Sequence, residues 1–512
     1  MNLLTDPVLT LSGGNQASLP ALFAAMARGE VRDFPVLRPH QRPAWHMFLV
    51  QLGALSLRAA DINELPKDAE EWASALRGLT PNHTDDAPWR LIVDEWDKPA
   101  FLQPPDPGSL KWSKVETPDA LDLLITSRNH DLKQTVARQA TAEDWIFALV
   151  SLQTCEGFGG RGNYGIARMN GGSSSRPMLG LVPGREKDVS VDPSAWWARD
   201  VQRLVKARAV EGREVGIVGG PALLWCLDWP GGQQLDLRNL DPWFIEICRR
   251  VRLVGADGVI SARRTTSKSA RIDAKVRKGN LGDPWAPVHK MEGKSLTISG
   301  GNFDYKRLCE LLFSGDWEVP LLARPESSET GDMLLVAEAL SRGNSKTEGF
   351  KSRVVLVPGQ VISLLPSETT ATLSKAQMQE IEGFDGAIGK ALALMAAGGE
   401  RSAVKKEHYA HARPARARFD RAADQLFFPS LWRRVAIASH SDDAVFKAKY
   451  DFLDNLMKAA QAELDAALPA ISCAAIHRPR AEARARQVFR GTLRGNPACR
   501  ELFIGEEMNV AV

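Results

Sequence analysis

The residue types best suited to binding gather in one glycine-rich stretch between Glu156 and Arg176. Seven glycines fall between positions 157 and 172, and Arg161 and Arg168 are interleaved with them. Glycine lets a ligand approach the main chain closely, and the serines and arginines beside it can contact phosphate oxygens. We therefore predict a loop that binds a polyanion, a phosphate or nucleic acid, with a flexible surface connector as the alternative.

The same stretch spells G-x-G-x-x-G at residues 160–165, the pattern of dinucleotide-binding loops. Such a loop must follow a strand and begin a helix, whereas here a predicted helix precedes it and a polar loop follows. It also lacks the Gly-Lys-Ser/Thr of a Walker A loop. No Ser/His/Asp order or paired-carboxylate motif stands out elsewhere. A nucleotide-dependent enzyme that uses residues 157–165 is thus the second hypothesis, and our first prediction is a protein without catalysis or cofactor.

Two further polar stretches have residue types that contact nucleic acid. Seven basic residues and a single acid, Asp273, lie between Arg263 and Lys278. Mixed with small hydroxyl residues, they suit phosphate contacts, and one lysine could enter a groove. Between Ser341 and Phe350, two glycines permit a tight hairpin tip. Read alone, the first stretch also fits a solvated hairpin and the second a plain turn.

The overall charge does not indicate a nucleic-acid binder, because 65 basic residues stand against 62 acidic ones, a net charge of +3. The charge is unevenly distributed. Residues 61–119 hold 13 acids and 6 bases, and residues 478–500 hold seven arginines against one acid. Arg486, Arg490 and Arg494 recur every four residues, which predicts a basic helix face. That face is either solvated or in contact with a polyanion.

Signals for metal binding, membrane insertion and secretion are weak. In Glu407-His408-x-x-His411 the two histidines could share a helix face and bind a metal, but a third ligand cannot be identified. None of the six cysteines forms a CxxC pair. No apolar run reaches the roughly 18 residues that span a bilayer, and the first residues lack the pattern of a signal peptide. We predict a cytoplasmic protein with no metal and no membrane contact.

The elements that must position these stretches change in character along the chain. Thirteen of the 14 tryptophans lie before residue 318, and the sequence after residue 368 is rich in strong helix formers. We predict an α+β protein, with a large mixed α/β domain over residues 1–368 and an antiparallel four-helix bundle over residues 369–512.

Hydrophobic spacing and capping residues place the individual elements. In the first part, helices are predicted at 42–57 and from Thr141 onward, and strands at 178–182, 223–227 and 354–357. In the second part, helices are predicted at 374–395 after the cap Ser374, at 402–411, at 415–427, from Ser441 onward and at 479–493.

With these residues in view, the chain resembles the CasA family, the large subunit of the type I-E CRISPR surveillance complex called Cascade. The opening MNLLTDPVLTL, the segment Pro99–Gln103 with the later Thr117-Pro118, and Gly157–Gly160 each match a family segment. Arg342–Gly349 resembles the family's wedge hairpin, and the C-terminal helices match its four-helix bundle. The matches follow the chain in order and cover nearly all of it.

In that family the subunit inspects double-stranded DNA for a protospacer-adjacent motif (PAM) through the minor groove. The resemblance implies that a glycine loop lies against this groove and that a lysine finger enters it. The residues of the loop would be Gly157, Phe158, Gly159, Gly160 and Arg161. The finger would be Lys268, or Lys275 because the alignment is loose there.

The resemblance also implies two further contacts. The hairpin tip, Asn344, Ser345 and Lys346, would open the first base pair beside the motif. A second loop would dock on the guide RNA and a neighbouring subunit through Asn129, His130, Asp131 and Leu132. The implied partners are the guide RNA (crRNA), double-stranded target DNA, the other Cascade subunits and the effector helicase-nuclease.

Two departures from the family pattern bear on these expectations. Some members carry glutamine at the wedge tip. The shorter side chain of Ser345 fills a base-pair gap less well than glutamine does. Some members carry clustered cysteines that could bind metal, and this chain has none, so no metal is expected. A free-standing DNA-binding protein without a guide is the third hypothesis.

Overall fold

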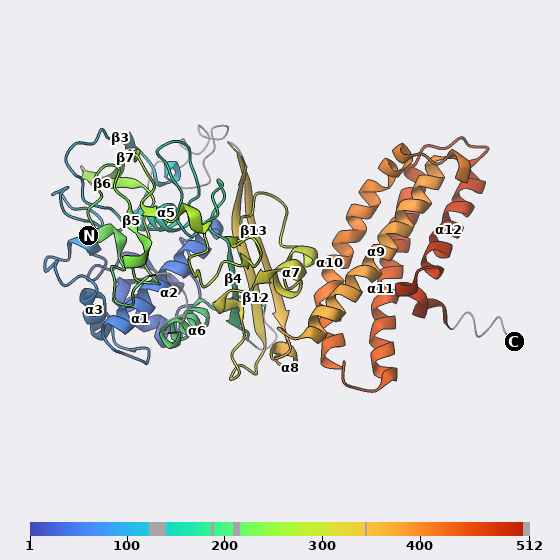
Figure 1. Ribbon diagram of the computed structural model, residues 1–512, viewed down its shortest axis with the longest axis horizontal. Coiled ribbons are helices and arrows are strands. Elements are labelled where there is room, and N and C mark those ends of the chain that lie inside the picture. The colour runs from blue at the N-terminus through green and yellow to red at the C-terminus, as the bar shows by residue number, and fades with distance from the viewer. Residues whose placement is uncertain (122–139, 186–188, 208–215, 344–345, 505–512) are drawn as a thin grey trace. The chain divides into compact units, whose positions relative to one another are not determined.

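The computed structural model describes residues 1–121, 140–185, 189–207, 216–343 and 346–504. The chain divides into two compact units (Figure 1). The first unit comprises residues 1–303, 316–325 and 331–356, and the second comprises residues 304–315, 326–330 and 357–512. Composition alone assigned the two short segments of the second unit, 304–315 and 326–330, to the first 368 residues.

The helices of the first unit surround a large apolar core. They are α1 (Leu19–Ala27), α2 (Arg42–Ala59), α3 (Ala69–Gly78), α5 (Ala142–Cys155) and α6 (Pro193–Lys206). Helices α2 and α5 are buried on nearly every side, and α2 packs against α3, α5 and α6. The predicted Thr141 cap is confirmed, because its hydroxyl accepts a hydrogen bond from the Asp144 amide while the Asp144 carboxylate accepts from the Thr141 amide.

The strands of the first unit form several small sheets rather than one doubly wound sheet. The sheet orders are β1-β2, β10-β9-β11, β13-β12-β4, β3-β7-β6 and β5-β8. The strands are β1 (Leu9–Thr10), β2 (Gln16–Ala17), β3 (Ser113–Val115), β4 (Met178–Pro183), β5 (Leu235–Asp236), β6 (Arg250–Ala256), β7 (Val259–Thr265), β8 (Ile272–Asp273), β9 (Val288–His289), β10 (Lys294–Ser295), β11 (Trp317–Glu318), β12 (Met333–Gly343) and β13 (Lys346–Val357). The strands predicted at 178–182 and 354–357 are confirmed, whereas residues 224–226 form a 3₁₀ turn instead of a strand.

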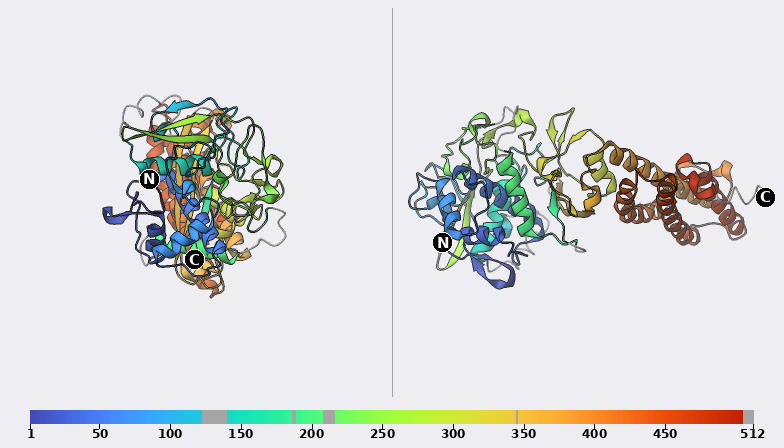
Figure 2. Two further views of the ribbon diagram at one scale, coloured as in Figure 1. Left: turned by 90° about the vertical axis from the view of Figure 1, so that its left-hand side faces the viewer. Right: turned by 90° about the horizontal axis from the view of Figure 1, so that it is seen from below.

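Four long helices make up most of the second unit and lie side by side in the views of Figures 1 and 2. They are α9 (Glu368–Ala396), α10 (Arg413–Ala436), α11 (Asp442–Ala467) and α12 (Arg478–Arg494), with the shorter α7 (Tyr305–Phe313) and α8 (Gly359–Ile362). Helix α9 packs against the other three long helices.

Cross-helix contacts give the direction of these helices. The Gln377 side chain donates to the Phe427 carbonyl at 2.7 Å, whereas Asp385, about two helix turns farther along α9, pairs with Arg416 near the start of α10. Likewise, Arg433 and Arg418 of α10 pair with Asp451 and Glu463 of α11. Later residues of one helix meet earlier residues of the next, so these neighbours are antiparallel. The predicted α+β class with a C-terminal helical part is confirmed.

The helix boundaries predicted in this part are wrong at three places. The helix predicted at 415–427 does not end there, because α10 continues to Ala436. Helix α9 begins at Glu368 rather than after Ser374, because the Ser367 hydroxyl accepts from the Thr370 amide and supplies the cap. Ser374 is buried in the helix, and its hydroxyl donates to the Ala371 carbonyl. The helix predicted at 402–411 is instead a pair of 3₁₀ turns, 401–403 and 406–412.

No helix of the described residues has the length and apolar character needed to span a bilayer.

Candidate nucleic-acid interface

The glycine-rich stretch follows directly after α5, and main-chain hydrogen bonds fix its conformation. The Phe158 amide donates to the Gly172 carbonyl at 2.7 Å, and the Ile166 amide donates to the Glu156 carbonyl at 3.0 Å. Gly159 and Asn163 close a tight turn between them, in which the Gly159 amide donates to the Asn163 carbonyl at 2.8 Å. The loop therefore presents a defined main-chain surface, unlike the flexible connector that was the alternative.

Two of its arginines are buried, so the prediction that they face a polyanion is wrong. Arg176 donates through Nε and Nη2 to Asp283, at 2.5 and 2.7 Å, and its guanidinium lies 5.2 Å from the Trp285 ring. Arg168 pairs with Glu246 at 3.4 Å and stacks on the Phe244 ring. Their partners lie about 80 to 110 residues away in the sequence, where local spacing cannot reveal them. These two buried arginines therefore hold the loop to the rest of the first unit.

The buried ion pairs determine the protonation states of Asp283, Arg168 and Arg176. Burial disfavours the charged form of Asp283, but Arg176 and then Arg168 overcome it and hold the pKa of Asp283 below its ordinary value. Burial lowers the pKa of Arg168 to about 10, with Glu246 opposing the shift. Both arginines are therefore protonated at neutral pH.

Close packing explains why two of the loop positions are glycine. A Cβ atom at Gly157 would lie 2.5 Å from the Ser174 carbonyl oxygen and 2.6 Å from that of Gly172. Gly162 has a φ of +81°, and a Cβ there would lie 2.6 Å from the Cβ of Thr266. The Ser267 amide donates to the Gly162 carbonyl at 2.8 Å. The glycine loop thus packs directly on the basic stretch that begins at Arg263.

The loop and the basic stretch together line a groove of about 970 Å³. From the predicted residues, Gly157, Phe158, Lys268 and Lys275 line it. Phe158 is 44% exposed, and both lysines are exposed, so the groove presents a glycine main chain, an aromatic ring and two ammonium groups to a ligand. The Tyr164 hydroxyl donates to the Lys268 carbonyl at 3.3 Å and holds that segment beside the loop.

The other predicted residues lie outside this groove. Gly159 lines a neighbouring cleft, and Gly160 and Arg161 are at the turn beside it, where Arg161 is exposed. The predicted docking loop, Asn129 to Leu132, lies outside the described residues. So do Asn344 and Ser345 of the predicted wedge, and Lys346 is described only as the first residue of β13.

The groove also contains residues that sequence reasoning did not single out. Tyr164, Lys278 and Lys294 line it with the predicted lysines. Lys278 ends the basic stretch, which could have indicated it. Lys294 is brought there by the pairing of β10 with β9, for which a two-residue strand gives no sequence signal.

The structure lacks the geometry that the nucleotide-enzyme hypothesis requires. Helix α5 precedes the G-x-G-x-x-G pattern, and the next regular element after it is strand β4, not a helix. Burial raises the pKa of the thiols, to about 11 for Cys155 and about 12 for Cys226 and Cys248. Among the described residues, no three His, Cys, Asp or Glu side chains form a group that could hold a metal ion.

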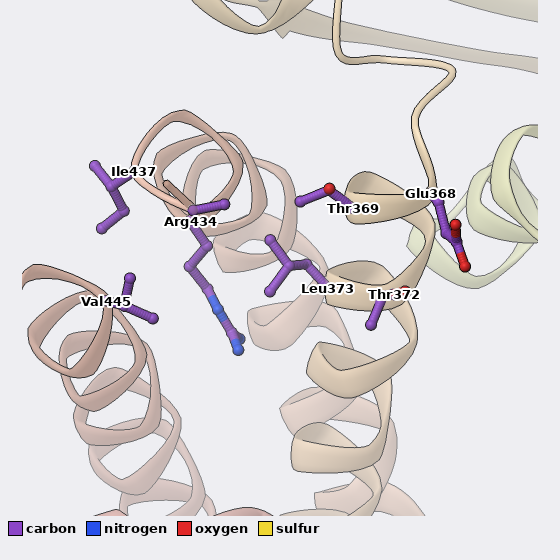
Figure 3. A pocket seen from close by; sticks show the side chains of 8 residues that line it. Glu368, Thr369, Thr372, Leu373, Arg434, Ile437 and Val445 are labelled. Atoms are coloured by element: carbon purple, nitrogen blue, oxygen red, sulfur yellow. The ribbon is translucent and has the colours of Figure 1, made fainter. Parts of the chain in front are cut away.

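A separate pocket of about 420 Å³ lies among helices of the second unit (Figure 3). Leu373, Ile437 and Val445 contribute apolar side chains to it from α9, from the residue after α10 and from α11. Its one basic group, Arg434, is already paired with Glu380 at 2.8 Å. The pocket therefore offers no unpaired basic group for ligand binding.

Comparison with known proteins gives the same fold over nearly the whole chain. No protein-family model matches the sequence, and no curated protein does. Among solved structures, the chain is similar to the CRISPR-associated protein Cse1 from Acidimicrobium ferrooxidans, with 15% identity, 98% of each chain covered and a TM-score of 0.62. It is similar to CasA from Thermus thermophilus, with 15% identity, 96% of this chain and 99% of that chain covered and a TM-score of 0.64. It is also similar to Cse1 from Thermobifida fusca, with 13% identity, 98% of each chain covered and a TM-score of 0.63.

Proposed function

We propose that this chain, which has the CasA/Cse1 fold, is the non-catalytic large subunit of a type I-E CRISPR RNA-guided complex and recognises the PAM in double-stranded DNA. The observation that carries the proposal is the groove in which Gly157, Phe158 and Lys268 meet. These three are among the residues that the resemblance assigned to minor-groove reading, and they come from segments about a hundred positions apart in the sequence.

The chemistry of the groove suits this role. The minor groove displays a degenerate set of acceptors, with the guanine amino group as its main distinguishing donor. Main-chain carbonyls of a glycine loop can accept from that amino group, and a lysine can donate to the acceptors. Such a site reads several related motifs rather than one. Sequence proper is then read by the guide RNA through base pairing, by analogy with other guide-directed effectors.

The remaining roles follow from the same proposal. Asn344, Ser345 and Lys346, which the resemblance assigns to a wedge hairpin, start the R-loop by separating the first base pair. Unstacking one step costs a few kcal/mol, which is within reach of a wedge once the duplex is held. Residues 129–132 contact the guide RNA or a neighbouring subunit. This chain also serves as the docking platform for the effector helicase-nuclease.

Affinity purification separates this proposal from the other two hypotheses. The tagged chain, recovered from its own host, is expected to bring down a short RNA and several other proteins, because a subunit of a guided complex is held by both. An enzyme of the second hypothesis would instead carry a bound nucleotide, released on heating. Recovery of the chain alone, with neither RNA nor companions, would refute the proposed assembly and leave the free-standing DNA-binding protein.

Replacement of Lys268 by alanine tests the groove itself. If Lys268 contacts a phosphate, the slope of log K against log salt for duplex binding should fall by about one unit, whatever the sequence. If it reads a base edge, discrimination between motifs should fall by about 1–3 kcal/mol. Lys290, exposed and outside the groove, provides the control substitution. If K268A behaves like K290A in both measurements, Lys268 is excluded as the finger, and Lys275 is the next residue to test.

A further inference from the structure

The chain segment that carries the proposed finger, Lys268, has no regular secondary structure of its own. This finger segment, residues 266–271, lies between β7, which ends at Thr265, and β8, which begins at Ile272. A lysine side chain has a flexible four-carbon stem, so the position of its ammonium group depends on how firmly the main chain is held. The contacts on either side of Lys268 therefore decide whether the groove presents a fixed finger.

The glycine loop holds the finger segment on its N-terminal side. The Ser267 amide donates to the Gly162 carbonyl at 2.8 Å, and the Ser267 hydroxyl donates to the same oxygen at 3.3 Å. The Tyr164 hydroxyl donates to the Lys268 carbonyl at 3.3 Å. All three hydrogen bonds come from the glycine loop, so the end of the finger segment that leads to β8 needs a different support.

Arg271 supports that end through both its main chain and its side chain. Its carbonyl accepts from the Leu235 amide at 2.9 Å, beside the pairing of β5 with β8. Its side chain is buried, and its guanidinium donates to three main-chain carbonyls: those of Asp228 at 2.9 Å, Leu227 at 2.9 Å and Leu224 at 3.3 Å. Both terminal nitrogens of Arg271 are therefore committed to the main chain of residues 224–228.

The residues that follow this main chain, 228–232, lie beside the ammonium group of Lys268. A Cβ atom built on Gly231 would lie 4.0 Å from Lys268 Nζ. Trp229 is buried, and the Arg271 guanidinium lies 5.0 Å from the centroid of its ring, within the range of a cation–π attraction. Arg271 thus links the main chain that carries Lys268 to the residues that its ammonium group lies beside.

We propose that Arg271 is a positioning residue for Lys268: it makes no contact with DNA itself, and it determines where the ammonium group of Lys268 lies in the groove. The inference rests on the proposed function, because it gives Arg271 a part in motif reading by Lys268. A contacting group that is already held in its bound position loses less freedom on binding, and so contributes more affinity. Loss of Arg271 should therefore weaken motif reading although no group that touches the duplex is removed.

Arg252 of β6 provides a matched control for the loss of a buried arginine. It is also buried, and burial lowers the pKa of both arginines to about 10, so both are charged at neutral pH. The Arg252 guanidinium lies 5.9 Å from the Trp96 ring and donates to three main-chain carbonyls, those of Val93, Lys98 and Pro104. It does not line the groove, and none of its hydrogen bonds reaches the finger segment. R271M and R252M should cost similar stability, and only R271M should affect Lys268.

The first measurement needs no DNA. Hydrogen–deuterium exchange of the full chain, read by mass spectrometry, reports how firmly the finger segment is held. We expect peptides that cover residues 266–271 to exchange about tenfold faster in R271M than in wild type, and no faster in R252M. R271K keeps the charge but offers one nitrogen in place of the guanidinium fork, so its exchange should fall between the two. Unchanged exchange in both R271M and R271K would overturn the inference.

The second measurement is binding of the assembled complex to duplexes that differ only in the bases beside the target. We expect R271M to lose about tenfold in affinity for the preferred duplex, close to the loss in K268A, and R252M to lose less than about twofold. The double variant K268A/R271M separates positioning from direct contact. If Arg271 acts through Lys268, the double variant loses no more than K268A alone. If Arg271 contacted a phosphate itself, the losses would add and the salt slope would fall by a further 0.9 or about that.

Three outcomes of the binding measurement would overturn the inference: additive losses in the double variant, full affinity in R271M beside weakened binding in K268A, or no loss in K268A. The first two leave motif reading by Lys268 standing. The proposed function fails in a different way, because the wild-type complex would then bind all the duplexes alike. The role of Arg271 in motif reading would fall with it, and the exchange measurement would still show whether Arg271 fixes the finger segment.

Discussion

Replacing Gly157 with alanine should weaken binding of a PAM-containing duplex to the assembled complex by about tenfold to a hundredfold, equivalent to about 1–3 kcal/mol of base-edge contacts. The reason is geometric. The new Cβ would lie within 2.6 Å of two main-chain oxygens, those of Gly172 and Ser174, so the loop must shift away from them. Because Gly157 and Phe158 line the groove, the shift moves its reading surface. Electrophoretic mobility shift of labelled duplexes measures the loss.

Two controls separate loop reading from general damage. A target whose complementary strand is already unpaired needs no motif reading and should bind G157A nearly as well as wild type. Gly331, which has open space around its missing Cβ, gives a matched glycine-to-alanine substitution that should be silent on both targets. Equal losses by G157A on paired and unpaired targets would contradict the assignment of this loop to duplex DNA.

Replacing Arg176 with methionine should lower the free energy of unfolding by about 3–5 kcal/mol, the usual cost of leaving one member of a buried ion pair alone. Both Arg176 and Asp283 are almost completely buried, and Asp283 would lose two hydrogen bonds at once. Urea unfolding followed by tryptophan fluorescence measures the change, since Trp285 lies beside the pair. Adding D283N should restore part of the loss, because no uncompensated charge then remains.

The pH dependence gives the same pair a second signature. The folded-state pKa of Asp283 lies below its ordinary value of 3.8. The stability that the pair contributes is therefore present above about pH 4 and is lost as the pH falls through the folded-state value. R176M should lack this component. Arg238, an exposed arginine paired with Asp236, provides the control, and R238M should leave stability nearly unchanged. A similar small effect for R176M would show that the pair does not anchor the loop.

Local signals predicted the elements well where propensity, capping and burial agree. Thr141 caps α5 as predicted, and the α12 boundaries, 478 and 494, lie within one residue of the predicted 479 and 493. The start of α9 was missed because Ser367 and Ser374 are equally good caps in sequence, and only the surrounding fold selects the earlier one. Residues 402–411 look helical by composition, yet the link between α9 and α10 contains two 3₁₀ turns, 401–403 and 406–412.

The site was predictable in its parts but not in its assembly. Glycine content indicated one wall of the groove and basic charge indicated the other. The family resemblance assigned both to reading of the minor groove. Sequence could not tell which arginines face a ligand, because that depends on carboxylates such as Glu246 and Asp283, which are distant in the chain. Arg161 remains exposed while Arg168 is buried, although the two look alike in the loop. The contribution of Lys294 likewise depends on strand pairing alone.

The ion pair between Arg342 and Glu156 has a consequence for how reading and opening are related under the proposed function. Arg342 is the second-last residue of β12, and Glu156 immediately precedes the glycine loop. A hairpin movement that withdraws Arg342 removes a cation from a carboxylate that is nearly buried, so it carries a free-energy cost felt at the loop. Thermodynamic linkage is reciprocal: if hairpin insertion changes the affinity of the groove for a duplex, then duplex binding biases insertion by the same factor. Motif recognition and strand separation would then be thermodynamically coupled through this ion pair, and no further element would be needed to connect them.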